Sequence, residues 1–396
     1  MIPLSQLKEA VEEGLAFLKE QDDVEEAEVY MASNGVLLTR LNYTSHIPCN
    51  GVEEPKSIEN YGVGIQAVFK DGEAKRVGFG SEPSDISIDG VRSALDKARK
   101  GAVTDPEFVG LARPTGEQRT LRDYHDPNLM EMRDEDLVGA GWKVINGALR
   151  VFQTSETLTS IAGNPDRLHE LGIIVGGDVT ILQERMAIAS YAMPRVQTDE
   201  STAIMSFITS MVEREESKGS GYGASTSLAG FTDEAGTEAA RNAIAGIGGV
   251  RLPTGDYRVV LGREAAMELL HYLIVPGLQT AMFYAAGSPF MGKLGQHVAS
   301  EKVTIVDDGA GEGLVGAKGI TDEGLPTGRT VLIDRGRLVG LLSNYYESQR
   351  LQRDERAKEK LGADPREWGS AFVPRNGFRF ARGGGRHFDS QPGIHP

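Results

Sequence analysis

The sequence predicts an α+β protein in which amino-terminal mixed sheet-and-helix regions are followed by a glycine-rich, barrel-like β domain. Segments with helical spacing of apolar residues are interspersed with segments in which every second residue is apolar. Glycine supplies 49 of the 396 residues, which exceeds its usual share and suits a β-rich domain with many tight corners. A chain of 396 residues is also too long to fold around one hydrophobic core of ordinary size, so several domains are expected.

We expect three units: an amino-terminal α/β lobe at residues 1–120, a middle α+β lobe at 121–249 and a carboxy-terminal β-rich domain at 250–396. The first boundary lies within residues 101–134, which are rich in Pro, Asp and Arg and show little periodicity. The second boundary follows from the turn-forming cluster that begins at Gly248.

The first element is predicted to be a helix, because its apolar residues share one face. These residues are Leu4, Leu7, Val11, Leu15 and Leu18. Segments 27–32 and 36–40 are predicted strands, and Asn34-Gly35 between them favours the positive φ angles of a tight hairpin. Alternating runs on both sides of residues 71–72 predict a second hairpin.

The remaining periodic segments follow the same rules. Helical spacing predicts further helices at residues 86–99, 134–151 and 233–247. Runs typical of β structure occupy residues 157–162, 172–182, 186–193 and 202–212. The run Tyr257-Arg-Val-Val-Leu-Gly predicts a strand at the start of the last domain, in which helix is expected to be scarce after about residue 285.

Composition excludes several classes of protein. The net charge of −15 repels a phosphate backbone, so nucleic acid is not expected as a general partner. No apolar run is long enough to cross a membrane, and the first residues do not resemble a secretory signal. The single cysteine, Cys49, excludes an intrachain disulfide and a cysteine-based zinc site. Together these features predict a cytoplasmic protein.

One basic cluster departs from the acidic average. It comprises Arg375, Arg379, Arg382 and Arg386, with Phe378 and Phe380 among them. Arginine with interleaved aromatic residues can stack on single-stranded nucleic acid, but a solvated loop or strand rim is the favoured interpretation. The sequence leaves the role of the Arg375–Arg386 cluster open.

His271 lies in the apolar run Glu268–Gln279, where a zinc protease would carry two histidines one helical turn apart, with a glutamate between them as general base. Here Tyr272 occupies the position of the base. Pro276 stands where the second ligand is required, and proline also tends to break a helix. A single histidine on an apolar face is more often a packed, hydrogen-bonded residue than a metal ligand.

Residues 287–294 match a phosphate-binding loop except at the last position, where Leu294 has no hydroxyl group for magnesium. A nucleotide site is therefore not favoured. Lys293 lies between two glycines and can meet the carboxylate of a peptide. We therefore take four residues as candidates for peptide binding: Gly292, Lys293, Gly295 and Gln296.

Three segments of the last domain have a distinctive sequence: Leu252-Pro-Thr-Gly-Asp-Tyr-Arg-Val-Val-Leu, Phe290-Met-Gly-Lys-Leu-Gly-Gln-His-Val-Ala-Ser and Thr321-Asp-Glu-Gly-Leu-Pro-Thr-Gly-Arg-Thr. Through these segments the chain, from about residue 255, resembles the TldD/PmbA (TldD/TldE) family, cytosolic proteins once labelled modulators of DNA gyrase and now regarded as peptidases. The hairpin at Tyr61-Gly-Val-Gly-Ile fits the amino-terminal domain of that family more loosely.

The resemblance implies a metal-free, TldE/PmbA-like member. In TldD-type subunits His-Glu-x-x-x-His and a late cysteine hold zinc, whereas the corresponding positions here are His271, Tyr272 and Pro276. These three are then vestigial, no residue is assigned as catalytic, and zinc is expected in a TldD-like partner instead of in this chain. The late cysteine has no counterpart before Pro396, so we expect the last domain to be truncated.

The function implied is that of a non-catalytic subunit of a cytosolic zinc metallopeptidase complex that degrades unfolded peptides. One alternative is an active metallopeptidase with a non-standard metal site built from His271, His297 and an unassigned carboxylate. Another is a homodimeric peptide-binding protein without chemistry, which captures extended chains at an exposed strand edge.

Overall fold

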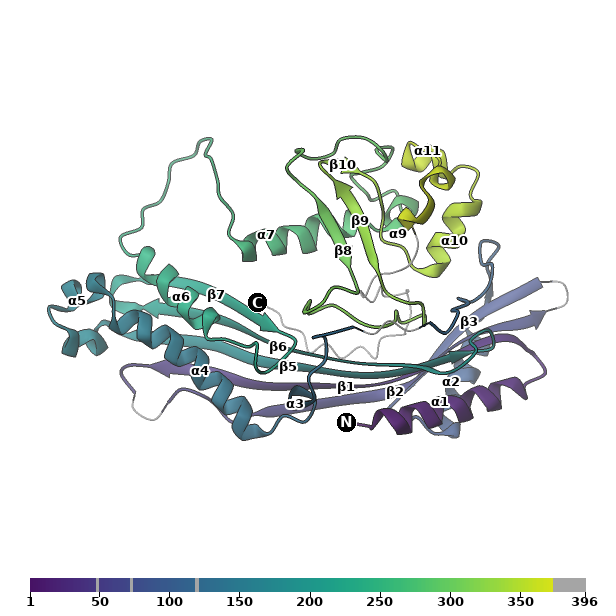
Figure 1. Ribbon diagram of the computed structural model, residues 1–396, viewed down its shortest axis with the longest axis horizontal. Coiled ribbons are helices and arrows are strands. Elements are labelled where there is room, and N and C mark those ends of the chain that lie inside the picture. Colours follow the sequence, from purple (N-terminus) through teal and green to yellow (C-terminus); the bar gives the residue numbers. More distant parts are fainter. Residues whose placement is uncertain (48–49, 72–73, 118–120, 373–396) are drawn as a thin grey trace.

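The computed structural model describes residues 1–47, 50–71, 74–117 and 121–372. A large curved sheet with helices on one face forms the amino-terminal part, and a smaller carboxy-terminal domain lies over its other face (Figure 1). The α+β class predicted from the sequence is confirmed. Among the described residues, no helix is both long enough and apolar enough to cross a bilayer.

The large sheet has seven strands in the order β4-β3-β2-β1-β5-β6-β7, and all its neighbouring strands are antiparallel. The strands are β1 (Val24–Thr44), β2 (Lys56–Asp71), β3 (Ala74–Pro83), β4 (Val103–Thr104), β5 (Ile173–Ser190), β6 (Gln197–Val212) and β7 (Ser217–Ser225). Because β1 pairs with β5, residues 1–120 and 121–249 contribute to one continuous sheet instead of two. The second predicted hairpin is confirmed by the pairing of β2 with β3.

Helices cover one face of this sheet. They are α1 (Leu4–Lys19), α2 (Ile88–Lys100), α3 (Pro127–Met130), α4 (Asp134–Gln153), α5 (Glu156–Ala162), η1 (Pro165–Leu171), a short η2 (Glu213–Glu215) and α6 (Glu234–Ala245). Val179 and Ile181 of β5 join the core beneath α4 and α6, and Ala187 and Ala189 on the same face join the core beneath α1 and α2. The helices predicted at the amino terminus and at 86–99, 134–151 and 233–247 are thereby confirmed.

The hairpin predicted at Asn34-Gly35 is wrong, because β1 runs straight through these residues. Asn34 pairs with Asn60 of β2 and with Glu184 of β5, so hydrogen-bonded neighbours on both sides outweigh the local turn propensity. The glycine instead permits close approach: a Cβ atom at Gly35 would lie 2.3 Å from Gln183 Oε1. Residues 172–182 and 186–193 likewise belong largely to one long strand, β5.

The β run predicted at residues 157–162 is also wrong, since these residues form α5. The hydroxyl of Ser155 accepts a hydrogen bond from the backbone N–H of Leu158, and Gly163 ends the helix in the left-handed region. These local caps favour a helix over the strand that the apolar pattern indicated.

The carboxy-terminal domain contains a three-stranded antiparallel sheet, in the order β10-β9-β8. Its elements are α9 (Thr280–Tyr284), β8 (Ile305–Asp308), β9 (Arg329–Asp334), β10 (Arg337–Leu338), α10 (Tyr345–Arg353), α11 (Ala357–Leu361) and η4 (Pro365–Phe372). Within the described residues this sheet is open. The expected scarcity of helix after residue 285 is wrong, because Leu351 of α10 and Leu361 of α11 complete the small core.

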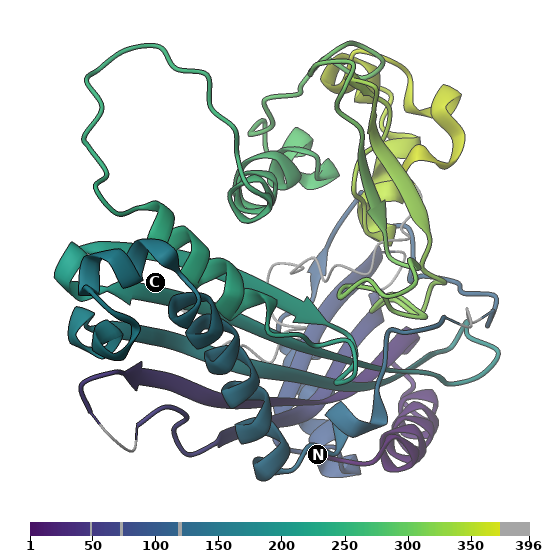
Figure 2. The ribbon, with the colours of Figure 1, turned by 60° about the vertical axis from the view of Figure 1, so that its left-hand side comes forward.

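A long connection joins the two parts and arches away from the body of the molecule (Figures 1 and 2). It leads from α6 into α7 (Arg263–Leu269), a π-helical turn η3 (Leu270–Ile274) and α8 (Val275–Gly277). The strand predicted at 257–262 is wrong in this structure, since the residues are exposed and belong to no sheet. The run has strand propensity, but no described strand lies beside it to pair with.

Candidate functional site

The helical segment that resembles a zinc-binding helix is exposed and interrupted. His271 and Tyr272 lie in the π-helical turn, and their rings meet edge to face with centroids 4.8 Å apart. Pro276 has no N–H to continue the α-helical pattern, and the N–H of Val275 donates to the carbonyl of Leu270, five residues earlier. The prediction that His271 is a packed residue is wrong, because its side chain is exposed.

The donor set around His271 does not fit zinc. A catalytic zinc site needs three protein ligands, and the described residues include no group of three His, Cys, Asp or Glu side chains placed to hold an ion. His297 lies on a different segment, in an isolated bridge to Arg337, and is exposed. Cys49 and the Arg375–Arg386 cluster lie outside the described residues.

The four residues predicted to bind peptide form a turn against the last helices. The N–H of Gly292 donates to the backbone carbonyl of Lys360 over 2.8 Å. The N–H of Gly295 donates to the backbone carbonyl of Leu338, also over 2.8 Å. The amide of Gln296 donates to the carbonyl of Gly292 over 2.9 Å. These groups are therefore engaged within the domain, and the exposed side chain of Lys293 is the group best placed for a peptide. Peptide binding here stays a prediction.

A buried polar cluster, which the sequence did not indicate, joins the carboxy-terminal domain to the sheet. The ammonium group of Lys318 donates to the carboxylate of Glu184 on β5, and the two side chains are 14% and 17% exposed. Beside them, Asp199 on β6 accepts from the N–H of Gly319 at 3.0 Å and from the hydroxyl of Tyr124 at 3.3 Å. Residues from three distant segments therefore meet at this junction.

Burial shifts the pKa values of two charged groups in this cluster, Asp199 and Lys318. It raises the pKa of Asp199 to about 6, although the positive charge of Lys318 opposes the rise. Burial likewise lowers the pKa of Lys318, while nearby acidic groups counteract that effect. The junction is completed by Ile320, which packs against Met186 and Ile188, and by Gln197, whose amide donates to the carbonyl of Gly324 over 2.7 Å.

Beside the junction, three apolar side chains on the same face of the sheet are partly exposed among the described residues. Ile58 and Leu182 lie on either side of Val36 in directly paired positions, and Phe207 follows on β6, paired with Asp178. The side chains of Ile58, Leu182 and Phe207 are 45%, 38% and 45% exposed. An exposed apolar patch of this kind is typical of a surface that contacts another polypeptide. We call these three residues the open sheet face.

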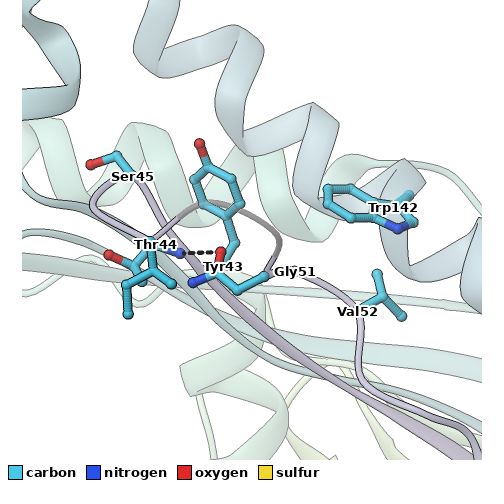
Figure 3. Close-up of a pocket in the computed structure, with 8 residues that line it drawn as sticks. Tyr43, Thr44, Ser45, Gly51, Val52 and Trp142 are labelled. Carbon is cyan, nitrogen blue, oxygen red and sulfur yellow. Dashed lines mark hydrogen bonds between the residues drawn. The ribbon is translucent and has the colours of Figure 1, made fainter.

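A separate pocket of about 510 Å³ lies at the far end of β1 beside α4 (Figure 3). Trp142 of α4 and Val52 form one side, while Tyr43, Thr44 and Ser45 line the other. The N–H of Thr44 donates to the side chain of Asn50 over 3.2 Å. None of the residues predicted from the sequence lines this pocket.

Comparison with solved structures defines the class of fold. TldE from Thermococcus kodakarensis superposes with a TM-score of 0.64 at 17% identity, over 86% of this chain and 71% of that protein. A protein from Bacteroides thetaiotaomicron described as a candidate modulator of DNA gyrase gives a TM-score of 0.68 at 16% identity, over 92% and 77%. At these identities the likeness concerns the fold alone.

Sequence comparison identifies the family. The model described as PmbA/TldA metallopeptidase C-terminal domain matches residues 254–373, and the model described as PmbA/TldA metallopeptidase domain 1 matches residues 50–102. The chain belongs to the TldD/PmbA family.

Two relatives show how much of each protein the sequence match covers. The metalloprotease TldD homolog of Haemophilus influenzae is 39% identical over 112 residues, which are 28% of this chain and 23% of that protein. A metalloprotease of Methanothermobacter thermautotrophicus is 29% identical over 115 residues, covering 28% of this chain and 25% of its own length. The chain therefore matches a quarter or less of the length of these relatives.

Proposed function

We propose that this chain is a non-catalytic, TldE/PmbA-like subunit of a cytosolic zinc metallopeptidase complex that acts on unfolded peptides. In this proposal a TldD-like partner carries the zinc and the general base. The chain itself contributes surface to the compartment in which peptides are bound.

The observation that carries the proposal is the composition of the exposed helical segment. One imidazole, a phenol and a proline occupy the positions at which a zinc peptidase has two imidazoles and a carboxylate. Tyrosine, with an ordinary pKa near 10, is a poor general base at neutral pH. The π-helical turn that contains His271 and Tyr272 also differs from the regular helix on which two ligands share a face.

The open sheet face supports the choice of substrate. Extended, unfolded chains expose alternate apolar side chains, which can contact the exposed apolar side chains of Ile58, Leu182 and Phe207. A folded protein keeps such side chains inside. Binding of a peptide on this surface needs no metal. In this proposal the zinc-dependent cleavage takes place in the partner subunit.

The test uses this chain produced alone and together with a TldD-like protein encoded in the same genome. We expect the chain alone to bind less than stoichiometric zinc and to leave an unfolded peptide uncleaved. The pair should co-purify, hold zinc and cleave the peptide, and His271→Ala should leave all three properties unchanged. Stoichiometric zinc and peptide turnover by the chain alone, both lost on His271→Ala, would disprove the proposal.

A second candidate function is peptide binding without chemistry by a homodimer. The open sheet face favours it, because that surface is present without any partner. A fluorescent unfolded peptide separates the two functions. Binding by this chain alone, with no TldD-like protein recovered in co-purification, would favour the second candidate, whereas co-purification would favour the first.

A further inference from the structure

A small cavity of about 150 Å³ lies where β1 and β5 meet the segment that follows β4. Three polar side chains in its wall come from distant parts of the chain: Glu26 from β1, Arg113 from the segment after β4 and Ser190 from the end of β5. The rest of the wall is apolar or aromatic and consists of Ala27, Leu111, Tyr191 and Ala192. A cavity of this size suits a small molecule better than an extended peptide.

The two charged groups in the wall are adjacent but loosely held. Nη2 of Arg113 donates to Oε1 of Glu26 at 3.3 Å, and the N–H of Leu111 donates to Oε2 of Glu26, also at 3.3 Å. Both distances exceed the usual N–H···O distance of about 2.9 Å. The side chain of Glu26 is 18% exposed and that of Arg113 is 65% exposed. A carboxylate can accept further hydrogen bonds and a guanidinium can donate further ones, so both groups retain capacity for a ligand.

The third polar residue of the wall, Ser190, is 1% exposed, and its hydroxyl has no hydrogen-bond partner among the residues that the structure describes. A buried hydroxyl without a partner lowers the stability of a folded protein. The hydroxyl of the neighbouring Tyr191, in contrast, donates to the carbonyl of Leu18 at 2.5 Å. The ring of Tyr191 therefore contributes apolar surface to the cavity, whereas Ser190 contributes a polar group that a ligand can satisfy.

An α-amino acid matches this arrangement of charges. Its ammonium and carboxylate groups are bonded to the same carbon atom, so both can contact an adjacent carboxylate and guanidinium at the same time. The ammonium group donates to Glu26 and Ser190, and the carboxylate accepts charge-assisted hydrogen bonds from Arg113. Such a ligand has no net charge, so it leaves neither charged group of the wall without a counter-charge. The volume limits the ligand side chain to a small one, which lies against the apolar part of the wall.

We propose that this cavity binds a small free α-amino acid, with its ammonium group on Glu26 and Ser190 and its carboxylate on Arg113. The inference does not depend on the proposed function, because the cavity shares no residue with the segment that contains His271 or with the open sheet face. The amino terminus of a peptide is the competing ligand, since it carries the ammonium group but no adjacent carboxylate.

Isothermal titration calorimetry of the full chain compares L-alanine with two analogues that each lack one charge. L-Alaninamide keeps the ammonium group and propionate keeps the carboxylate, so L-alanine should bind at least about tenfold more tightly than either. L-Tryptophan should also bind at least about tenfold more weakly than L-alanine, because its side chain is too large for the cavity. Undetectable binding of L-alanine would overturn the proposal. Equal binding of L-alanine and L-alaninamide would also overturn it, and would assign the cavity to a peptide amino terminus.

Substitutions in the wall test the role of each group. Arg113→Gln should abolish the preference for L-alanine over L-alaninamide, because the variant lacks the guanidinium that contacts the ligand carboxylate. Glu26→Gln should weaken L-alanine binding at least about tenfold, and Ser190→Ala at least about threefold. The matched control is Arg92→Gln, because the side chain of Arg92 is 54% exposed and pairs with Asp89 instead of lining the cavity. This variant should bind L-alanine as the wild type does, and circular dichroism should confirm that all variants are folded. A folded Arg113→Gln variant that keeps the preference, or a folded Glu26→Gln variant with wild-type affinity, would overturn the proposal.

Discussion

Replacing Asp199 by asparagine should stabilise the protein at neutral and alkaline pH. Asp199 is 3% exposed, and burial holds its pKa near 6, above the ordinary value of 3.8. The charged form is therefore less stable in the folded protein than in the unfolded chain. Asparagine has nearly the same shape, can still accept from Gly319 and Tyr124, and carries no charge.

The magnitude follows from the two pKa values. Their difference, about 6 minus 3.8, multiplied by about 1.36 kcal/mol per pH unit, gives about 3 kcal/mol of destabilisation by the charged carboxylate of Asp199. The amide N–H groups of asparagine lack assigned acceptors, so we expect a net gain of about 1–3 kcal/mol at pH 8.

The direction of the pKa shift determines the pH range in which the charge of Asp199 destabilises the folded protein. Below pH 3.8 the carboxyl group of Asp199 is protonated in both states and its burial carries no charge penalty. The penalty grows as pH rises from 3.8 and is complete above about 6. The difference in unfolding free energy between Asp199→Asn and wild type should therefore be small near pH 4 and largest at pH 7 to 8.

Urea unfolding, followed by the fluorescence of the two tryptophans, measures this difference across the pH range. The control is Asp89→Asn, because the side chain of Asp89 is 84% exposed and forms only a surface ion pair with Arg92. That variant should change stability by less than about 0.5 kcal/mol. An Asp199→Asn variant that is no more stable than wild type at pH 8 would refute the reasoning.

Three further substitutions test the packing of the fold. Glu184→Gln leaves the ammonium group of Lys318 buried without its ion-pair partner. The free energy of unfolding, measured by urea titration at pH 7, should therefore fall by about 3 kcal/mol. A loss below about 0.5 kcal/mol would contradict the importance of the buried pair. Gly236→Ala should lower the thermal midpoint, because a Cβ atom there would lie 2.0 Å from the backbone oxygen of Val144 where α6 crosses α4. The control is Gly139→Ala on the exposed face of α4, where an added Cβ atom would have no neighbour within 4 Å. This variant should instead stabilise the helix by up to about 1 kcal/mol. Equal thermal midpoints for the two glycine variants would disprove the close contact at Gly236.

Several elements could be predicted from the sequence because local patterns decide them. The spacing of Leu7, Val11 and Leu18 fixes which face of α1 is buried, and all three are fully buried. The residues at 271, 272 and 276 could be read as a departure from a zinc site without coordinates, because ligand chemistry depends on side-chain identity.

Other features depended on contacts that no local pattern encodes. The turn propensity of Asn34-Gly35 could not reveal that β2 and β5 pair with β1 on both sides. Nor could the strand propensity of Tyr257–Leu261 show that no described strand lies beside it. His271 was expected to be packed, and its exposure follows from how α7 is placed, which its own sequence does not specify.

The α+β class, the family and the departure of residues 271, 272 and 276 from a zinc-binding pattern could be predicted without coordinates, because side-chain identity and short-range periodicity carry that information. The contacts of Lys318 with Glu184 and of Gly319 with Asp199 join residues more than a hundred positions apart along the chain, so they depend on the tertiary structure. The same holds for the partial exposure of Ile58, Leu182 and Phe207 on the sheet. Burial and the pairing of distant strands set both outcomes, and these depend on the whole fold.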